Sequence, residues 1–123
     1  MPENRGREHH YERMSVALRE EIGIIFEGEL GDPRIGLATV TEVRLAPDGR
    51  SARVLVFVDG DDAEAERTLE GLNAATAYIR RELAERLRLR RSPELHFVID
   101  RSQEFEVRVD KILKRVSKKK KAQ

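Results

Sequence analysis

The segment from Arg80 to Arg91 constrains the fold most, because it is both highly charged and periodically apolar. Its sequence, RRELAERLRLRR, contains six arginines and two glutamates. Guanidinium groups are costly to bury unpaired, so most of these arginines must face solvent or an anionic partner. Ile79, Leu83 and Leu87 nevertheless recur every four residues, the spacing of one helix face. The sequence therefore predicts a helix that contributes to the core and presents a basic face on its other side.

The first part of the chain predicts a helix followed by a hairpin. Apolar residues recur at steps of three and four from Tyr11 to Ile25, which indicates an amphipathic helix of about four turns. Gly31-Asp32-Pro33 is expected to end it. Residues 37–45 and 51–58 are rich in β-branched and apolar side chains, and the turn sequence Ala46-Pro47-Asp48-Gly49 separates them. We expect two antiparallel strands.

Two further helices are predicted in the second half. Asp61 or Asp62 can cap the first of them, whose acidic first turn complements the helix dipole. The apolar spacing then continues to Leu87, which would make a single helix unusually long for a small domain. Gly71 and Asn73 weaken its middle, so a kink or a change of axis is expected near residues 73–77.

A third strand is predicted after the helices. Ser92-Pro93 ends the helical region, and residues 95–99 (LHFVI) have the composition of a strand. The expected fold is α+β with the order α-β-β-α-α-β, in which a three-stranded sheet packs on helices. A short helix is possible over 109–116, and the lysines that follow have no means of packing and are expected to be flexible.

Length and composition indicate one domain. A chain of 123 residues can bury one modest core but not two. It contains no cysteine, which excludes disulfides and thiolate metal sites. The N-terminal residues lack the apolar centre of a signal peptide, and the longest apolar run, 54–58, is far too short to span a bilayer. We expect a cytoplasmic protein without membrane contact.

Charge is distributed unevenly along the chain. The 24 basic and 23 acidic side chains nearly cancel, yet residues 108–123 carry a net charge of +7 and the rest carries −6. Such a tail is typical of a solvated extension, of a polyanion-binding one, or of both. We expect a flexible N-terminus at 1–10, a domain at 11–107 and a partly disordered basic extension at 108–123.

No pattern in the sequence favours catalysis or metal binding. His9, His10 and His96 lack a second ligand at helical spacing. Residues 59–70 have acidic side chains at three calcium-loop positions but lack the central glycine, so a helix N-terminus explains them better. Gly28-Glu29-Leu30-Gly31 has the spacing of a KH-domain loop, but Glu29 would repel phosphate. We expect no enzymatic activity, no cofactor, no metal and no small-molecule substrate.

The basic helix has two interpretations. At 100° per residue, Ala77, Arg81, Ala84 and Arg88 share one face, shallow enough for a sugar-phosphate backbone to approach. The alternative is a solvated helix with ion pairs from Glu85 to Arg81 or Arg88. The nearby Arg90 and Arg91 and the basic tail favour nucleic acid. Aromatic residues make up only 5% of the chain, so recognition is expected to depend on backbone and shape.

Several segments taken in order resemble bacterial ribosome-binding factor A. The similarity extends from about residue 11 to residue 110, and the ordered set is far more specific than any single motif. The matching stretches are Leu18-Arg19-Glu20-Glu21-Ile22, Asp32-Pro33-Arg34-Ile35-Gly36, Thr39-Val40-Thr41-Glu42-Val43, Ala52-Arg53-Val54 with Val56, Tyr78-Ile79-Arg80, Leu87-Arg88-Leu89-Arg90, and Pro93-Glu94-Leu95 with Phe97 and Asp100.

The resemblance implies a type II KH-like fold with the element order predicted above. In that family the junction between the two central helices has the form Ala-x-Gly, whereas this chain has Ala75-Thr76-Ala77. A left-handed backbone at Ala77 would be strained, because alanine lacks the conformational freedom of glycine. A smoother helical kink is the alternative.

The resemblance also implies a non-catalytic assembly factor. The family binds the immature small (30S) ribosomal subunit, contacts its 16S rRNA and supports late rRNA processing and maturation, including in the cold. Direct RNA contact is then expected from the junction, the arginines beside it, the N-terminal arginines and the basic tail. These residues are Ala75, Thr76, Ala77, Arg80, Arg81, Arg88, Arg90, Arg91, Arg5, Arg7, Lys111, Lys114, Arg115, Lys118, Lys119, Lys120 and Lys121.

The alternative to RNA binding is a protein-interaction adaptor. An exposed sheet edge or helix face would then bind another protein, and the charges would keep the chain soluble. In either case a monomer is the simplest expectation.

Overall fold

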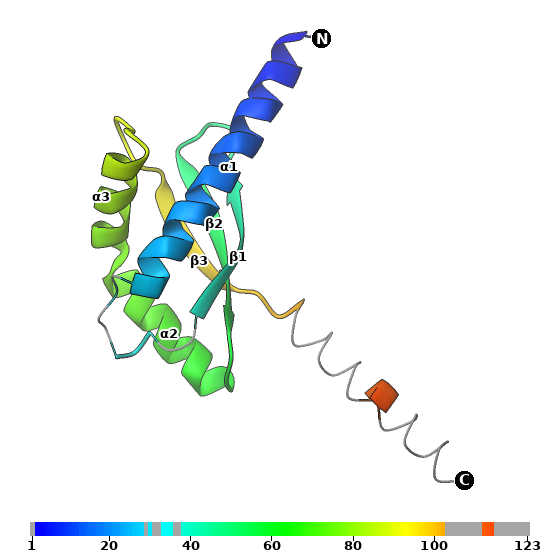
Figure 1. The fold of residues 1–123 in the computed structure, drawn as a ribbon, viewed down its shortest axis with the longest axis vertical. Helices are drawn as coiled ribbons and strands as arrows, with labels where there is room; N and C mark the ends of the chain where they lie inside the picture. The colour runs from blue at the N-terminus through cyan, green and yellow to red at the C-terminus, as the bar shows by residue number, and fades with distance from the viewer. Residues whose placement is uncertain (1, 29, 31–32, 36–37, 103–111, 115–123) are drawn as a thin grey trace.

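A computed structural model describes residues 2–28, 30, 33–35, 38–102 and 112–114, with side chains described from residue 10 onward. The predicted order α-β-β-α-α-β is confirmed (Figure 1). The elements are α1 (Pro2–Gly28), β1 (Ala38–Leu45), β2 (Ser51–Val58), α2 (Asp62–Ala74), α3 (Thr76–Arg86) and β3 (Glu94–Ile99).

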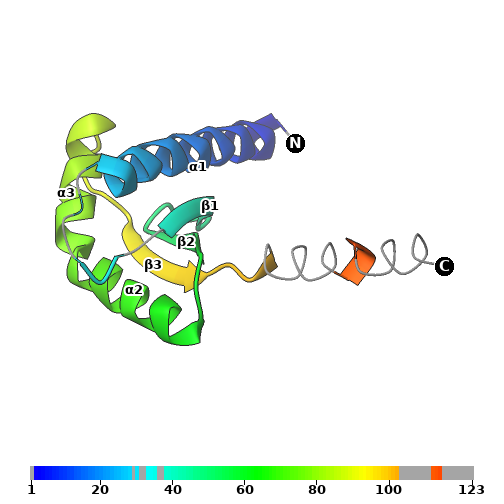
Figure 2. The same cartoon turned by 60° about the horizontal axis from the view of Figure 1, so that its bottom comes forward.

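One three-stranded sheet, in the order β1-β2-β3, forms the centre of the fold. Strands β1 and β2 pair antiparallel, as predicted, and β3 pairs with β2 in parallel. Burial alternates along β2, with Ala52, Val54, Val56 and Val58 buried between more exposed residues. The helices pack against the buried face, and no element that the structure describes covers the other face (Figure 2).

The predicted apolar stripes form the core. Leu18, Ile22 and Ile25 of α1 are fully buried, as are Ile79 and Leu83 of α3. They pack with the inward side chains of β2 and with Leu72 of α2, which is also fully buried. Burying a side chain of this size contributes roughly 1.5–3 kcal/mol to stability. Leu87 packs on the same cluster and is half-buried.

Helix α1 is longer than predicted. It begins at Pro2, so residues 2–10, which were expected to be a flexible terminus, are helical. The apolar spacing that defines a buried helix begins only at Tyr11, and the residues before it carry no core-facing signal. Proline suits the first turn of a helix, because its missing N–H would have no partner there.

Local signals positioned the hairpin and α2 correctly. The Ala46 N–H donates to the Ser51 carbonyl at 2.8 Å, and Gly49 has a φ of 72°, a conformation that glycine adopts without strain. Asp61 caps α2 by accepting a hydrogen bond from the Glu64 N–H at 2.8 Å. The acidic run at 59–62 therefore ends in a helix N-terminus, as predicted.

Gly71 is a packing residue of α2. A Cβ added there would lie 2.7 Å from Ile35 Cγ1 and 3.1 Å from Arg34 Cβ. The loop at 33–35 therefore approaches the helix backbone directly. The glycine that appeared to weaken the helix permits this contact.

A hydrogen bond at a bulge in β1 links the first strand to Asp100, the residue that follows the last strand. The register of β1 and β2 shifts between Val40 and Glu42, at Thr41. The Thr41 hydroxyl donates to Asp100 Oδ2 at 2.5 Å, and Ser102 donates to Asp100 Oδ1 through its N–H at 3.0 Å and its hydroxyl at 2.7 Å. The hydrogen bond from Thr41, followed by those from Ser102, lowers the pKa of Asp100 below its usual value.

We expect this cluster to give pH-dependent stability. The folded pKa of Asp100 lies below the unfolded one, so its contribution is present at neutral pH and is lost as the pH falls below about 4 and through the folded pKa. Thr41→Val should raise the pKa of Asp100 toward its usual value and destabilise the fold by about 1 kcal/mol at pH 7. NMR titration of the Asp100 carboxyl measures the pKa directly. An unchanged pKa in Thr41→Val would refute the assignment.

Part of the C-terminal prediction lies outside the described residues. This applies to the flexibility of the basic tail and to most of the helix expected at 109–116. Ile112 and Leu113 are described and are more than half exposed. Within the described parts of the chain, no helix combines the length and apolarity needed to cross a bilayer.

Candidate nucleic-acid interface

The junction between α2 and α3 is a single non-helical residue. Ala75 has φ −90° and ψ 0°, and its N–H donates to the carbonyls of Gly71 at 3.0 Å and Leu72 at 3.1 Å. The Thr76 hydroxyl donates to the Leu72 carbonyl at 3.1 Å and so bridges the break. Ala77 is a helical residue of α3. The chain therefore makes a smooth kink and does not need the missing glycine.

The exposed face of α3 is shorter than predicted. Ala77 and Arg81 are exposed and Ala84 is half-buried, but α3 ends at Arg86. Arg88 therefore does not continue the helical face on which the 100° rule placed it. The ion pairs predicted from Glu85 to Arg81 or Arg88 are not formed among these described residues, whereas Arg86 pairs with Glu82 one turn earlier.

Arg88 occupies a left-handed position that ends the helix. Its φ is 52°, and in the described part of the chain no other non-glycine residue has a positive φ. The Leu89 N–H donates to the Ala84 carbonyl at 2.9 Å and the Arg88 N–H to the Glu85 carbonyl at 3.4 Å. These two bonds form a Schellman motif, in which glycine is the usual residue at the position that Arg88 occupies.

Replacing Arg88 should separate backbone strain from side-chain function. We expect Arg88→Gly to stabilise the protein by about 0.5–1 kcal/mol, because the left-handed conformation costs arginine more than glycine. Arg88→Ala retains the strain and should give no such gain. Urea unfolding of both variants tests this, and an equal effect of the two substitutions would contradict it.

Arg80 has a structural role that the sequence did not reveal. Its Nε donates to the Pro93 carbonyl at 3.1 Å and its Nη2 to the Ser92 carbonyl at 2.8 Å. The side chain is half-buried. These charge-assisted bonds fix the segment at 87–93 to α3, so Arg80 positions that segment. Its contact with phosphate stays a prediction.

Arg86 joins α3 to α1. Its guanidinium lies 3.5 Å from Glu21 Oε2 through Nη1 and 3.4 Å from Glu82 Oε2 through Nε. These contacts neutralise the arginine and tie the helices together. Arg86 is therefore an arginine of this segment whose charge has partners within the protein.

Three other arginines of the segment lie at one end of the sheet, which we call the arginine end. It consists of Arg88, Arg90 and Arg91 with Arg50, and all four side chains are exposed. The segment 87–93 enters β3 beside the hairpin turn, where the Glu94 N–H donates to the Arg50 carbonyl at 2.9 Å (Figure 1). Arg50 was not predicted as part of this surface, because only the parallel pairing of β2 and β3 brings the turn beside this segment.

The other predicted contacts are only partly described. Arg5 and Arg7 lie in α1, but their side chains are not described. Lys114 is exposed. Lys111, Arg115, Lys118, Lys119, Lys120 and Lys121 lie outside the described residues. The structure therefore brings together Arg88, Arg90 and Arg91 on one segment, with Arg81 and the junction on the adjoining helix.

The described residues contain no cluster of three or more histidine, aspartate or glutamate side chains that could hold a metal ion. Exposed guanidinium groups on a fixed segment are suited to binding phosphate oxygens, which they can engage in bidentate fashion.

Comparison with known sequences identifies the family of this chain. The family model described as ribosome-binding factor A matches residues 10–113. The chain is 58% identical to ribosome-binding factor A of Koribacter versatilis over 120 residues, covering 98% of both chains. It is 44% identical to the protein of that name from Solibacter usitatus, covering 88% of both.

Solved structures support the same relationship. The crystal structure of ribosome-binding factor A from Thermus thermophilus has a TM-score of 0.66 and 32% identity, covering 75% of this chain and 98% of that one. A homology model of the Thermus thermophilus protein, fitted into a cryo-EM map of its complex with the 30S subunit, has a TM-score of 0.60 and 33% identity and covers 71% and 91%. With a family model that spans most of its length and relatives of this similarity, the chain belongs to the ribosome-binding factor A family.

Proposed function

We propose that this protein is a non-catalytic assembly factor that binds 16S rRNA of the free, immature 30S subunit. The observation that carries the proposal is the arginine end. Arg88, Arg90 and Arg91 are exposed, make no ion pair among the described residues, and lie on a segment that Arg80 and a Schellman motif hold in place. The Thermus thermophilus relative, fitted into a cryo-EM map of a complex with the 30S subunit, gives further support.

The proposed contacts follow from this geometry. Arg81, Arg88, Arg90 and Arg91 contact phosphates, and the small side chains at Ala75 and Ala77 let the backbone approach α3. Arg80 is not among these four phosphate contacts, because its guanidinium positions the segment at 87–93. The N-terminal arginines and the basic tail, including Lys114, remain proposed sources of long-range attraction.

Binding alone is sufficient for the proposed action. A protein shifts an RNA equilibrium by its differential affinity for the two conformations. This protein would hold one arrangement of the small-subunit RNA during late processing and leave when the subunit matures. The need for such a factor increases in the cold, because escape from misfolded RNA requires thermal activation. The proposed location is the cytoplasm and the proposed state is a monomer.

Co-sedimentation tests this function. The purified protein is mixed with isolated small subunits, large subunits and joined ribosomes, and we expect preference for free small subunits. Affinity for 16S rRNA should fall with salt at a log-log slope of roughly −0.7 to −0.9 per phosphate contact. Absence of ribosomal association, or a flat salt dependence, would favour a protein-interaction adaptor.

A further inference from the structure

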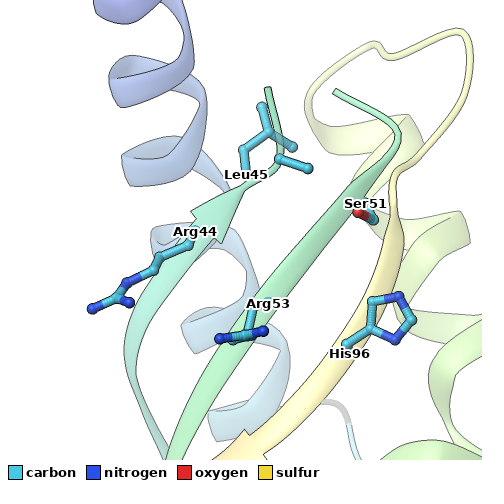
Figure 3. Close-up of a pocket in the computed structure, with 6 residues that line it drawn as sticks. Arg44, Leu45, Ser51, Arg53 and His96 are labelled. Atoms are coloured by element: carbon cyan, nitrogen blue, oxygen red, sulfur yellow. The ribbon is translucent and has the colours of Figure 1, made fainter. Parts of the chain in front are cut away.

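The open face of the sheet carries a row of basic side chains, one from each strand. Arg44 of β1 is paired in register with Arg53 of β2, and Arg53 is paired with His96 of β3. All three side chains are exposed on the face opposite the helices. Figure 3 shows Arg53 between the other two. We call these three residues the sheet-face row.

Fold stability does not explain the sheet-face row. Like charges directly opposite each other on paired strands are destabilising. Glu42 offsets the charge of Arg44: the Arg44 Nε donates to Glu42 Oε1 at 2.9 Å and its Nη2 donates to Oε2 at 3.2 Å. This contact lowers the pKa of Glu42. Arg53 makes no hydrogen bond or ion pair with any described side chain. The central cation of the row is therefore available to an external anion.

A hollow of about 280 Å³ lies over the row. It is lined by the three basic side chains together with Leu45, Ala46 and Ser51, and none of the described carboxylates lines it (Figure 3). Guanidinium, imidazole and hydroxyl groups can all donate hydrogen bonds into this space. Glu94, at the start of β3, is an exposed carboxylate near its border and pairs in register with Ser51.

The sheet-face row also adjoins the arginine end. Arg50 lies directly before β2, three residues from Arg53, and its carbonyl accepts from the first residue of β3. Basic side chains thus extend from the segment at 87–93, past the hairpin turn, onto the open face of the sheet. Adjacent strands are roughly 4.8 Å apart, so the row spans about 10 Å, which suits an extended polyanion better than a single carboxylate.

We propose that the sheet-face row is a second phosphate-binding surface, on which Arg53 holds the backbone of small-subunit RNA that continues from the arginine end. The proposal depends on the proposed function for the nature of its ligand, but it adds a face of the domain that the helices and the junction do not reach. RNA would then wrap around the end of the sheet.

Charge removal at Arg53 tests the proposal by affinity. We expect Arg53→Gln to weaken binding to protein-free 16S rRNA by roughly 3–10-fold and to reduce the salt slope by about 0.7–0.9, the loss of one phosphate contact. The matched control is Arg67→Gln, which removes an exposed arginine from α2 beside the other end of β2 and should leave the slope unchanged. Glu94→Gln should tighten binding roughly twofold, because it removes a like charge beside the phosphate path.

The absence of cysteine permits a second test by position. Arg53→Cys and Arg67→Cys each create a unique attachment site for an iron chelate that cleaves nearby RNA. On isolated small subunits, cleavage from position 53 should fall on RNA adjacent to that cleaved from a third variant, Arg90→Cys. Position 67 should give weak cleavage or none.

The outcomes separate this proposal from the function on which it depends. If Arg90→Gln weakens binding and Arg53→Gln does not, the second surface is refuted and the function stands. If the unmodified protein fails to bind the RNA, the function itself fails. If Arg53→Gln weakens binding to subunits while leaving binding to protein-free 16S rRNA unchanged, the row contacts a ribosomal protein and the proposal is refuted.

Discussion

Replacing Arg90 and Arg91 together by glutamate should weaken binding to 16S rRNA by roughly 100- to 1,000-fold. Two phosphate contacts are lost and two negative charges are placed where the RNA backbone lies, so the salt slope should also fall by about 1.4–1.8. Both side chains are exposed and have no partner among the described residues, so the fold should remain intact. Filter binding over a range of salt concentrations measures affinity and slope together.

The control for this double variant has the same net charge. Arg19→Glu with Arg67→Glu reverses two exposed arginines on α1 and α2, away from the arginine end. It should lower affinity only through weaker long-range attraction, an effect that disappears above physiological salt. Equal losses in the two double variants at high salt would mean that the arginine end has no specific role.

Replacing Gly71 by alanine should destabilise the protein, although alanine is the better helix former. The new Cβ would meet Ile35 Cγ1 at 2.7 Å, and the neighbouring Ile35 backbone nitrogen at 3.4 Å limits how far the loop can move aside. Overpacking of this kind costs roughly 1–3 kcal/mol, more than the gain in helix propensity of about 1 kcal/mol. Urea unfolding should therefore show a net loss of up to about 2 kcal/mol.

Gly23 provides the matched control. It lies in α1, and an added Cβ would meet no atom within 4 Å. Gly23→Ala should accordingly stabilise the protein by about 0.5–1 kcal/mol through helix propensity alone. If Gly71→Ala were stabilising to the same degree, the close approach of the loop at 33–35 to α2 would be disproved.

The elements that the sequence predicted correctly depend on local signals. Apolar spacing identified the buried faces of α1 and α3, and the turn at 46–49 defined the hairpin. The break at Ala75 followed from excessive helix length. Each of these features is determined by residues within a few positions of one another, which is the range over which pattern and propensity operate.

The features that escaped prediction depend on distant contacts. Nothing adjacent to Arg80 indicates that its guanidinium binds carbonyls twelve and thirteen residues away. Arginine is an unusual residue for a left-handed helix end, so Arg88 was placed on a helical face that stops before it. The alignment of Arg44, Arg53 and His96 requires the strand register, which composition cannot supply.

The proposed binding surface depends on the pairing of β3 with β2, which joins residues farther apart in the sequence than the pairing of β1 with β2. Strand β3 lies at an edge and reaches β2 only after the whole of α2 and α3. If β3 detaches, the hydrogen bond from the Glu94 N–H to the Arg50 carbonyl, which holds the segment at 87–93 beside the hairpin turn, is broken and His96 leaves the open face. RNA bound there would therefore stabilise the final strand by mass action, and the amides of β3 should exchange hydrogen more slowly in the complex than in the free protein.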